Sequence, residues 1–440
     1  MTLTLRTFGA LFALVTLAAA DTRADELRPN IILILADDVG YGQLGSYGQQ
    51  LMQTPRLDRM AAEGLRFTRF YAGAPSCLPS RVSLMNGLHM GHARVRTNGG
   101  SGSHPPIHEE DICVSTVLQH AGYLTGMMGK WALGDKFLGN VNSSDNVDGS
   151  GAVYKHGWDF YLGEPNQSYN HNYYPSFLYR YDPRGLLGPA TDANRLVSFP
   201  MADAPETPEF TEDYTMDLYT RTALDFIDAA KDQPFFLYIP YTAIHNKRQV
   251  PELEPYTESQ SWPAGAKVMA SMLSRMDRDV GRILDRLASH GIADNTLVIF
   301  TSDNGADAAW WNDIFDNNGG LKGSKHFLTE GGLRVPCIAW WPGTIAPGRE
   351  SDEKLAFWDF MPTLSELAGI TAPEPTDGIS FVPTLLARAG QRSHDYLYFY
   401  LTGGHYPSGG HYIVRGDGES RSDSEIIDAA FLEETVVPAL

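Results

Sequence analysis

The run from Asn30 to Ala36 (NIILILA) limits how this chain can fold more than any other segment. It is continuously apolar and rich in β-branched residues, which is typical of a strand buried on both faces of a mainly parallel sheet. Asp37 and Asp38 follow at once. In open α/β sheets the ligand crevice lies beyond the carboxyl ends of the strands, so both acids are expected where the chemistry takes place.

Later segments repeat the alternation of strand and helix. Thr54 and Pro55 provide a helix cap and a first-turn proline, Gly64 ends that helix, and a strand follows over residues 65–71. Further helices are predicted over residues 111–120, 211–230 and 265–290, and further strands over residues 124–128, 235–240 and 296–301. This alternation predicts an α/β fold in which helices sandwich a large, mainly parallel mixed β-sheet.

Two loop-rich regions and the C-terminal region differ from this pattern. Residues 140–152 and 181–209 are rich in Gly, Asn, Asp and Pro, and we predict long loops there, around a substrate cleft. After residue 375 the segments become short, which predicts a small antiparallel β-subdomain over residues 376–440, with an atypical or incomplete end. The main domain is predicted to span residues 27–375.

The N-terminal segment predicts export. Phe8 to Ala20 form an apolar run behind Arg6 that ends in small residues, the layout of a secretory signal peptide over residues 1–20. The run is shorter than the roughly 20 residues that a membrane-spanning helix needs. We therefore expect a periplasmic or secreted protein with no membrane span after signal cleavage.

Charge and cysteine usage restrict the partners. The chain has 34 Lys and Arg residues against 53 Asp and Glu residues, a net charge of −19, which excludes nucleic-acid binding through a basic surface. An anionic ester is still a possible substrate, because salt screens surface charges beyond about 10 Å and local cations control a cleft. Cys113 and Cys337 could form a disulfide, but with only three cysteines in the chain we expect buried free thiols.

A second pair of hard ligands follows another predicted strand. Asp303 and Asn304 come directly after the strand over residues 296–301, as Asp37 and Asp38 follow the first strand. Either pair alone is more often a turn or a helix cap. Together, these carboxylate and amide side chains favour Ca²⁺ or Mg²⁺ over zinc or copper, and we expect Ca²⁺.

Cys77 lies in the segment from Ser76 to Gly87 (SCLPSRVSLMNG). The pattern Cys-x-Pro-Ser-Arg followed by a leucine and a glycine resembles the signature of the type I sulfatases of the alkaline phosphatase superfamily. In that family a separate maturation enzyme oxidises the cysteine to formylglycine, an aldehyde. The hydrated aldehyde carries two hydroxyls on one carbon, so one oxygen can attack sulfur and the other can expel the sulfate. A helix starting at Pro79 places this carbon at a positive helix N-terminus.

Other segments extend the resemblance over about residues 29–418. Gly129 to Gly134 (GKWALG) is similar to the family segment Gly-Lys-Trp-His-Leu-Gly, and Lys325 precedes Glu330-Gly331-Gly332 at the family spacing. The resemblance implies that Lys130 contacts the formylglycine and the sulfate. It also implies that His245 and Lys325 bind the sulfate, and that either can act as general acid.

The resemblance implies roles for the remaining candidates as well. Arg81, from the same motif as Cys77, would stabilise the hydrated aldehyde. The metal ligands it implies are Asp37, Asp38, Asp303, Asn304 and the oxygen that replaces the Cys77 sulfur.

Ala132 departs from the family pattern. In many sulfatases the histidine at this position is thought to accept the proton that releases sulfate. Some bacterial carbohydrate-type sulfatases also have a small residue there, and they carry a later segment similar to Asn170 to Pro175 (NHNYYP). His171 is therefore our candidate for the missing base. The alternative is that His171 is a loop histidine without a catalytic role.

These observations predict a sulfuric ester hydrolase that removes sulfate from a sulfated carbohydrate or an aryl sulfate by S–O cleavage. The partners expected are the sulfated substrate and a formylglycine-generating enzyme. Two alternatives stay open. One is a phosphodiesterase or phosphonate monoester hydrolase of the same superfamily. The other is a non-catalytic homologue that binds sulfated glycans, as Ala132 and the atypical terminus suggest.

Overall fold

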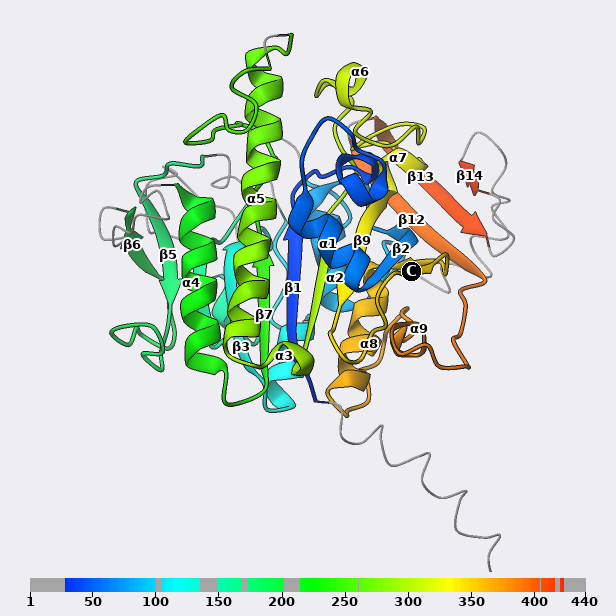
Figure 1. Ribbon diagram of the computed structural model, residues 1–440. Helices are drawn as coiled ribbons and strands as arrows, with labels where there is room; N and C mark the ends of the chain where they lie inside the picture. Colours follow the sequence, from blue (N-terminus) through cyan, green and yellow to red (C-terminus); the bar gives the residue numbers. More distant parts are fainter. Residues whose placement is uncertain are drawn as a thin grey trace, which may run out of the picture.

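A large mixed β-sheet runs through the middle of the molecule (Figure 1). The computed structural model describes residues 28–99, 105–134, 149–167, 172–201, 214–259, 261–403, 405–415 and 420–422. The strands of the sheet follow the order β10-β2-β9-β8-β1-β7-β3-β4-β5-β6, with β11 paired to β2. Their bounds are β1 Asn30–Ala36, β2 Leu65–Tyr71, β3 Leu124–Lys130, β4 Phe160–Glu164, β5 Phe177–Tyr181, β6 Val197–Pro200, β7 Phe235–Pro240, β8 Thr296–Ser302, β9 Arg334–Trp340, β10 Arg349–Ser351 and β11 Leu355–Ala356.

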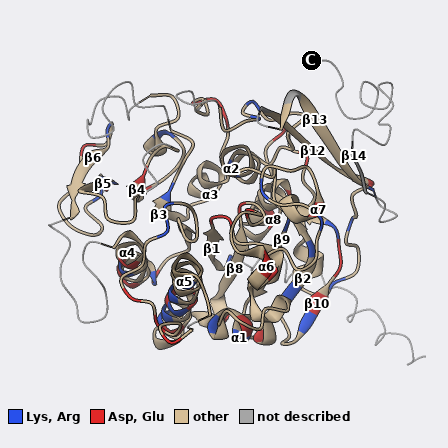
Figure 2. Cartoon of the chain, turned by 90° about the horizontal axis from the view of Figure 1, so that it is seen from above, with Lys and Arg blue, Asp and Glu red and all other residues tan. Residues whose placement is uncertain are grey.

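Helices cover both faces of this sheet (Figure 2). Their bounds are α1 Pro55–Glu63, α2 Cys77–Asn86, α3 Val114–His120, α4 Thr215–Ala230, α5 Ala264–Ser289, α6 Asn312–Phe315, α7 Glu330–Leu333, α8 Phe360–Leu367 and α9 Val382–Leu385. The strands from β8 through β1, β7 and β3 to β4 are mutually parallel, whereas β9 is antiparallel to both of its neighbours. The predicted α/β fold with a mainly parallel mixed sheet is confirmed.

The alternating sides of β1 explain its unbroken apolar sequence. Ile31, Leu33 and Leu35 belong to the apolar cluster that α2, α3 and α8 cover. Ile32 and Ile34 belong to the opposite cluster, under α1, α4 and α5. Because both faces are shielded from water, neither set of side chains can be polar without a cost in stability.

Several predicted boundaries differ from the structure. Helix α2 begins at Cys77 and not at Pro79, because Ser76 is the last residue with extended backbone and its carbonyl accepts the Ser80 N–H at 3.2 Å. Helix α3 begins at Val114, three residues later than expected. Strand β6 lies inside the predicted loop over residues 181–209, where it extends the sheet edge by pairing antiparallel with β5. The predicted signal peptide and His171 lie outside the described residues.

A small antiparallel sheet follows near the C-terminal end of the described residues. It contains β12 Tyr396–Gly403, β13 Tyr406–Arg415 and β14 Ser420–Ser422, in that order. Its apolar side packs on Tyr71, Leu333 and Trp358 of the main body. The small antiparallel sheet was predicted, whereas the exact boundary between residues 375 and 376 stays a prediction.

The cysteines behave as expected, since Cys77, Cys113 and Cys337 are buried and free. Within the described residues, no helix has the length and apolar character required to cross a membrane.

Candidate active site

Polar residues lie at or directly after the carboxyl ends of four neighbouring parallel strands. Ala36 at the end of β1 lies in register with Ser302 at the end of β8, so the residues that follow the two strands emerge side by side. Strand β7 lies on the other side of β1 and leads to His245, and β3 beyond it ends in Lys130. The carboxyl ends of parallel strands thus bring together residues far apart in sequence.

The acidic pair after β1 is held by backbone contacts with the segment after β7. The Asp37 N–H donates to Ala243 O at 2.8 Å, and the Ile244 N–H donates to Asp37 O at 2.8 Å. Asp38 has a φ of 67°, in the left-handed region that aspartate tolerates better than most residues. Both carboxylates are fully buried. Their position is therefore set by the backbone and not by chance surface packing.

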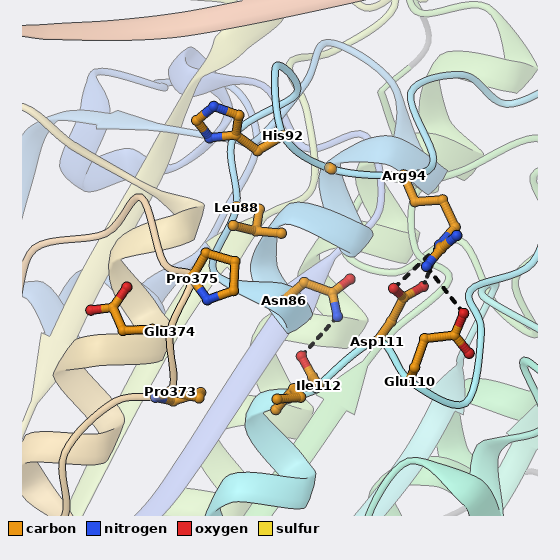
Figure 3. A pocket seen from close by; sticks show the side chains of 11 residues that line it. Asn86, Leu88, His92, Arg94, Glu110, Asp111, Ile112, Pro373, Glu374 and Pro375 are labelled. Atoms are coloured by element: carbon orange, nitrogen blue, oxygen red, sulfur yellow. Dashed lines mark hydrogen bonds and ion pairs between the residues drawn. The ribbon is translucent and has the colours of Figure 1, made fainter. Parts of the chain in front are cut away.

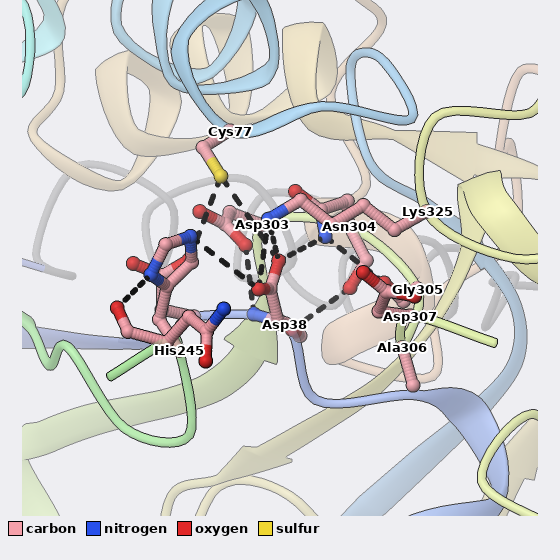
Figure 4. Close-up of polar contacts among 12 residues, drawn as sticks. Asp38, Cys77, His245, Asp303, Asn304, Gly305, Ala306, Asp307 and Lys325 are labelled. Carbon is pink, nitrogen blue, oxygen red and sulfur yellow. Dashed lines mark hydrogen bonds and ion pairs between the residues drawn. The ribbon is translucent and has the colours of Figure 1, made fainter. Parts of the chain in front are cut away.

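Helix α2 presents Cys77 to these acids (Figure 4). Cys77 is the first residue of the helix and is completely buried. Its Sγ lies 3.6 Å from Asp37 Oδ1 and 4.0 Å from Asp38 Oδ1. Arg81 is one helical turn further on, and residues four apart lie on the same helix face. The spacing Cys-x-x-x-Arg therefore directs both side chains to the strand ends.

Two buried cations neutralise Asp37 and Asp303. The Lys130 Nζ donates to Asp37 Oδ2 at 2.7 Å. The Arg81 guanidinium donates through Nε to Asp303 Oδ2 at 2.9 Å, and its Nη1 donates to the carbonyl of Lys130 at 2.9 Å. Arg81 thus connects the ends of α2, β3 and β8.

A second group surrounds Asp38. The Lys325 Nζ lies 2.7 Å from Asp38 Oδ1 and 2.8 Å from Oδ2, and the Asn304 Nδ2 donates to Oδ1 at 2.6 Å. The His245 Nε2 lies 3.6 Å from Asp38 Oδ2. Lys325 comes from a loop that is fixed over this site, because its N–H donates to Ala306 O at 3.0 Å.

The charges shift the acidities of these groups. Burial would raise the pKa of Asp37 and of Asp38, but the surrounding basic groups together outweigh it, chiefly Lys130 at Asp37 and Lys325 at Asp38, so both pKa values lie below the usual range. Burial and the nearby Asp37 raise the pKa of Asp303 to about 7 despite Arg81. Burial raises the pKa of the Cys77 thiol to about 12. At neutral pH the unconverted cysteine is therefore a neutral thiol and a poor nucleophile.

His245 is neutral at pH 7, because burial lowers its pKa to about 4. Its Nδ1 lies 2.7 Å from Asn246 O, and a carbonyl oxygen can only accept, so Nδ1 carries the proton. The unprotonated Nε2 consequently faces Asp38 and the reaction centre.

The donor set fits a hard divalent cation. Asn304 Oδ1 is buried and has no hydrogen-bond partner among the described residues, which leaves an oxygen ligand unsatisfied beside Asp38. Ligand atoms of Asp37, Asp38, Cys77 and His245 lie within 4.8 Å of one another. Carboxylate and amide oxygens suit Ca²⁺ or Mg²⁺, and the oxygen that replaces the Cys77 sulfur would add one more hard ligand.

The structure brings together every described residue predicted for the site. These are Asp37, Asp38, Cys77, Arg81, Lys130, His245, Asp303, Asn304 and Lys325, each no more than 7% exposed. Ala132 is also buried, with a φ of 67°. Sequence reasoning missed Arg248 and Trp310, which lie next to His245. The position of Arg248, three residues after His245 in the same loop, was a sequence signal that could have identified it as a site residue.

A separate pocket lies near the C-terminal end of α2 (Figure 3). Among its lining residues, Asn86 Nδ2 donates to Ile112 O at 2.8 Å, and Arg94 forms ion pairs with Glu110 and Asp111. Its lining includes none of the predicted site residues. The chemistry is therefore expected at the strand ends and not in this pocket.

Comparison with known proteins agrees with this geometry. Residues 29–370 match the sulfatase family model, and residues 323–418 match the C-terminal model of N-sulphoglucosamine sulphohydrolase. The chain is 34% identical over 388 residues to human N-acetylgalactosamine-6-sulfatase, covering 85% of this chain and 68% of the relative. It is 31% identical over 390 residues to an arylsulfatase of Hemicentrotus pulcherrimus, covering 87% of this chain and 66% of the relative.

A solved structure has the same architecture over almost the whole chain. It is Ps i-CgsB in complex with k-i-k-neocarrahexaose, which superposes with a TM-score of 0.70 at 26% identity, covering 93% of this chain and 90% of that one. The family match extends over most of the chain, including both acidic pairs, Cys77 and Lys325. The chain belongs to the sulfatase family.

Proposed function

We propose that this protein is a formylglycine-dependent sulfatase that hydrolyses the sulfate ester of a carbohydrate. One observation carries the proposal: Cys77 stands at the first residue of a helix, over two buried aspartates that are each paired with a lysine. A cysteine with a purely structural role does not need buried, charged residues around it. Three buried carboxyl groups and three buried cations within one cluster are costly unless a ligand uses them.

The charge balance of the cluster supports an anionic substrate. Asp37, Asp38 and Asp303 face Arg81, Lys130 and Lys325, so a divalent cation would leave the site with a net positive charge. Ca²⁺ held by Asp37, Asp38, Asp303 and Asn304 would polarise the sulfate oxygens. Formylglycine at position 77 would supply a hydrated aldehyde as the nucleophile.

The chain's own residues orient and neutralise the ester. Lys130 contacts Asp37 and Lys325 contacts Asp38, so both ammonium groups are available to neutralise a sulfate bound at the acidic pair. Arg81 fixes Asp303 and holds the end of β3. Lys325 is proposed to protonate the leaving oxygen, whereas His245 directs an unprotonated Nε2 at the centre and would have to take up a proton there before it could act as the acid. His171 is still our candidate for the base that replaces the histidine missing at Ala132.

The carbohydrate substrate class is supported by relatives. Human N-acetylgalactosamine-6-sulfatase is named for a sulfated sugar, and Ps i-CgsB was solved with a neocarrahexaose. Export is supported by the apolar run over residues 8–20 behind Arg6. The maturation enzyme is required as a partner because a buried, neutral thiol does not become an aldehyde unaided.

The test is sulfate release by protein produced with a formylglycine-generating enzyme. Matched sulfate, phosphate and phosphonate esters of one alcohol should show preferential cleavage of the sulfate ester. A Cys77→Ala variant provides the control, since it retains the cluster and lacks the nucleophile. Preferential cleavage of the phosphate or phosphonate ester would replace the proposal with the hydrolase alternative. Absence of sulfate release from fully converted protein would contradict it.

A further inference from the structure

Arg248 is a half-buried cation beside the candidate active site. Its guanidinium carbon lies 4.0 Å from the ring centroid of Trp310 and 5.1 Å from that of Trp311. Its Nε and Nη2 atoms are buried and have no hydrogen-bond partner in the described part of the chain. The guanidinium therefore lies against two aromatic rings, and two of its donor atoms have no acceptor among the described residues.

The position of Arg248 is tied to that of His245. The Trp310 ring packs edge-on against the His245 imidazole, with 6.4 Å between the two centroids. The guanidinium carbon of Arg248 lies 4.0 Å from the centroid of the same ring. The guanidinium carbon thus lies no farther from the imidazole centroid than the sum of these two distances. A group bound by Arg248 would therefore be close to a sulfate bound by His245.

The loops that carry these residues are anchored. The Tyr173 hydroxyl donates to His245 O at 2.9 Å, and the Tyr214 hydroxyl donates to Gln249 O at 3.1 Å. The buried Asn317 Nδ2 donates to Trp310 O at 2.6 Å. Residues on both sides of Arg248 and the ring beneath it are thus held before any ligand binds. A preorganised cation loses less entropy when it binds than one on a free side chain.

The surrounding acids do not satisfy the guanidinium. Asp38 and Asp307 act on Arg248 through their charge, but neither forms an ion pair with it within the described ranges. The carboxylate oxygens of Asp38 are already bonded to Lys325 and Asn304. Buried donors without acceptors cost free energy, so a site that keeps them is expected to meet an acceptor from outside.

We propose that Arg248, supported by Trp310, forms a subsite for a second anionic group of the substrate. The proposal deepens the proposed sulfatase function and rests on it. A planar guanidinium with two idle donors matches the oxygens of a carboxylate or of a second sulfate. The substrate class is accordingly a saccharide that carries another acidic group near the scissile sulfate ester.

The experiment compares kcat/KM for four substrates, using enzyme in which Cys77 has been converted to formylglycine. They are 4-nitrophenyl sulfate, a monosulfated disaccharide, the same disaccharide with a second sulfate, and the monosulfated disaccharide with a uronic acid carboxylate. Wild type should favour the doubly anionic sugars. Arg248→Ala should lower kcat/KM for them by about 10- to 100-fold, mainly through KM, as expected for the loss of a hydrogen-bonded charge outside the reacting centre. The two doubly anionic sugars distinguish a sulfate subsite from a carboxylate subsite.

Two further variants separate recognition from structure. Lys247→Ala removes an exposed neighbouring cation and should leave the substrate preference unchanged. Arg248→Lys keeps the charge but loses the planar fork, so it should recover only part of the preference. An equal loss on all four substrates would make Arg248 a structural residue, and a wild type without preference for the second anion would also overturn the subsite.

A binding measurement tests the subsite independently of the proposed sulfatase activity. Titration calorimetry of the disulfated and monosulfated disaccharides uses wild type, Arg248→Ala and Lys247→Ala in the presence of Ca²⁺. Tighter binding of the disulfated sugar by wild type and Lys247→Ala, but not by Arg248→Ala, supports the subsite even if no ester is cleaved. Equal binding by all three proteins would overturn it whether or not sulfate is released.

Discussion

Replacing Lys325 by methionine tests how the buried cations and the acidic pair depend on each other. The Lys325 Nζ bridges both oxygens of Asp38 at 2.7 and 2.8 Å, and the two residues are 6% and 0% exposed. Breaking a buried pair by removing one partner costs about 3–5 kcal/mol, because the other charge stays buried and unpaired. With an unfolding entropy of about 2.1 cal/mol/K per residue, this corresponds to a fall of about 3–5 °C in Tm for a chain of 440 residues.

The pH dependence and the response to Ca²⁺ identify the cause of this loss. Burial would raise the pKa of Asp38, but the basic groups around it, chiefly Lys325, hold it below its usual value. A carboxyl with a depressed pKa contributes stability above its unfolded pKa, and that contribution is lost as the pH falls through the folded value. The deficit of Lys325→Met should therefore be largest near neutral pH and shrink in acid. Ca²⁺ should raise the Tm of the variant more than that of wild type, since the ion compensates the unpaired Asp38.

Calorimetric scans of metal-free and Ca²⁺-loaded protein between about pH 2 and pH 8 provide the assay, because the stability that Asp38 contributes is lost below the ordinary carboxyl pKa. Lys322→Met is the matched control, because this lysine is exposed and lies in the same loop. It should leave Tm and its response to Ca²⁺ unchanged. Equal effects of the two substitutions, or a Lys325→Met deficit that does not change with pH, would refute the reasoning. Loss of this cation should also lower kcat by about 10²–10³, as for removal of one transition-state donor.

Four further outcomes are expected. Peptide mass spectrometry should find formylglycine at Cys77 after expression with a maturation enzyme; only unmodified cysteine, in a host shown to mature another sulfatase, would contradict this. Because the Cys77 thiol is 0% exposed and its pKa is raised to about 12, the folded unconverted protein should resist alkylation at this residue, and rapid labelling would show that it is not buried in solution. Chelation should inactivate the enzyme and Ca²⁺ should restore it, whereas full activity of metal-stripped protein would reject the assignment of the oxygen ligands. His171→Ala should leave a burst of alcohol followed by turnover slowed by about 10²–10⁴, and an unchanged rate would reject His171 as the base.

Local sequence patterns predicted the framework of the site. The apolar run before Asp37 specified a strand buried on both faces, and its end placed the acids at the sheet edge. The segment after Cys77 predicted a helix from Pro79, and the helix in the structure starts two residues earlier, which places Cys77 and Arg81 on one helix face. These features depend on chain geometry over a few residues, so the sequence alone determines them. Helix starts were less well predicted, because α2 and α3 begin after Ser76 and Cys113, neither of which caps its helix through a side-chain hydrogen bond.

Only the tertiary structure decided which of these groups meet. Asp38 pairs with Lys325, 287 residues away, and with Asn304, 266 residues away. Those pairings require the strand order β8-β1-β7-β3, which long-range packing selects and no local pattern encodes. The placement of Arg248 on Trp310 depends in the same way on two loops that follow different strands. Strand β6, inside a segment with loop composition, forms because β5 offers it an unpaired edge to bond to.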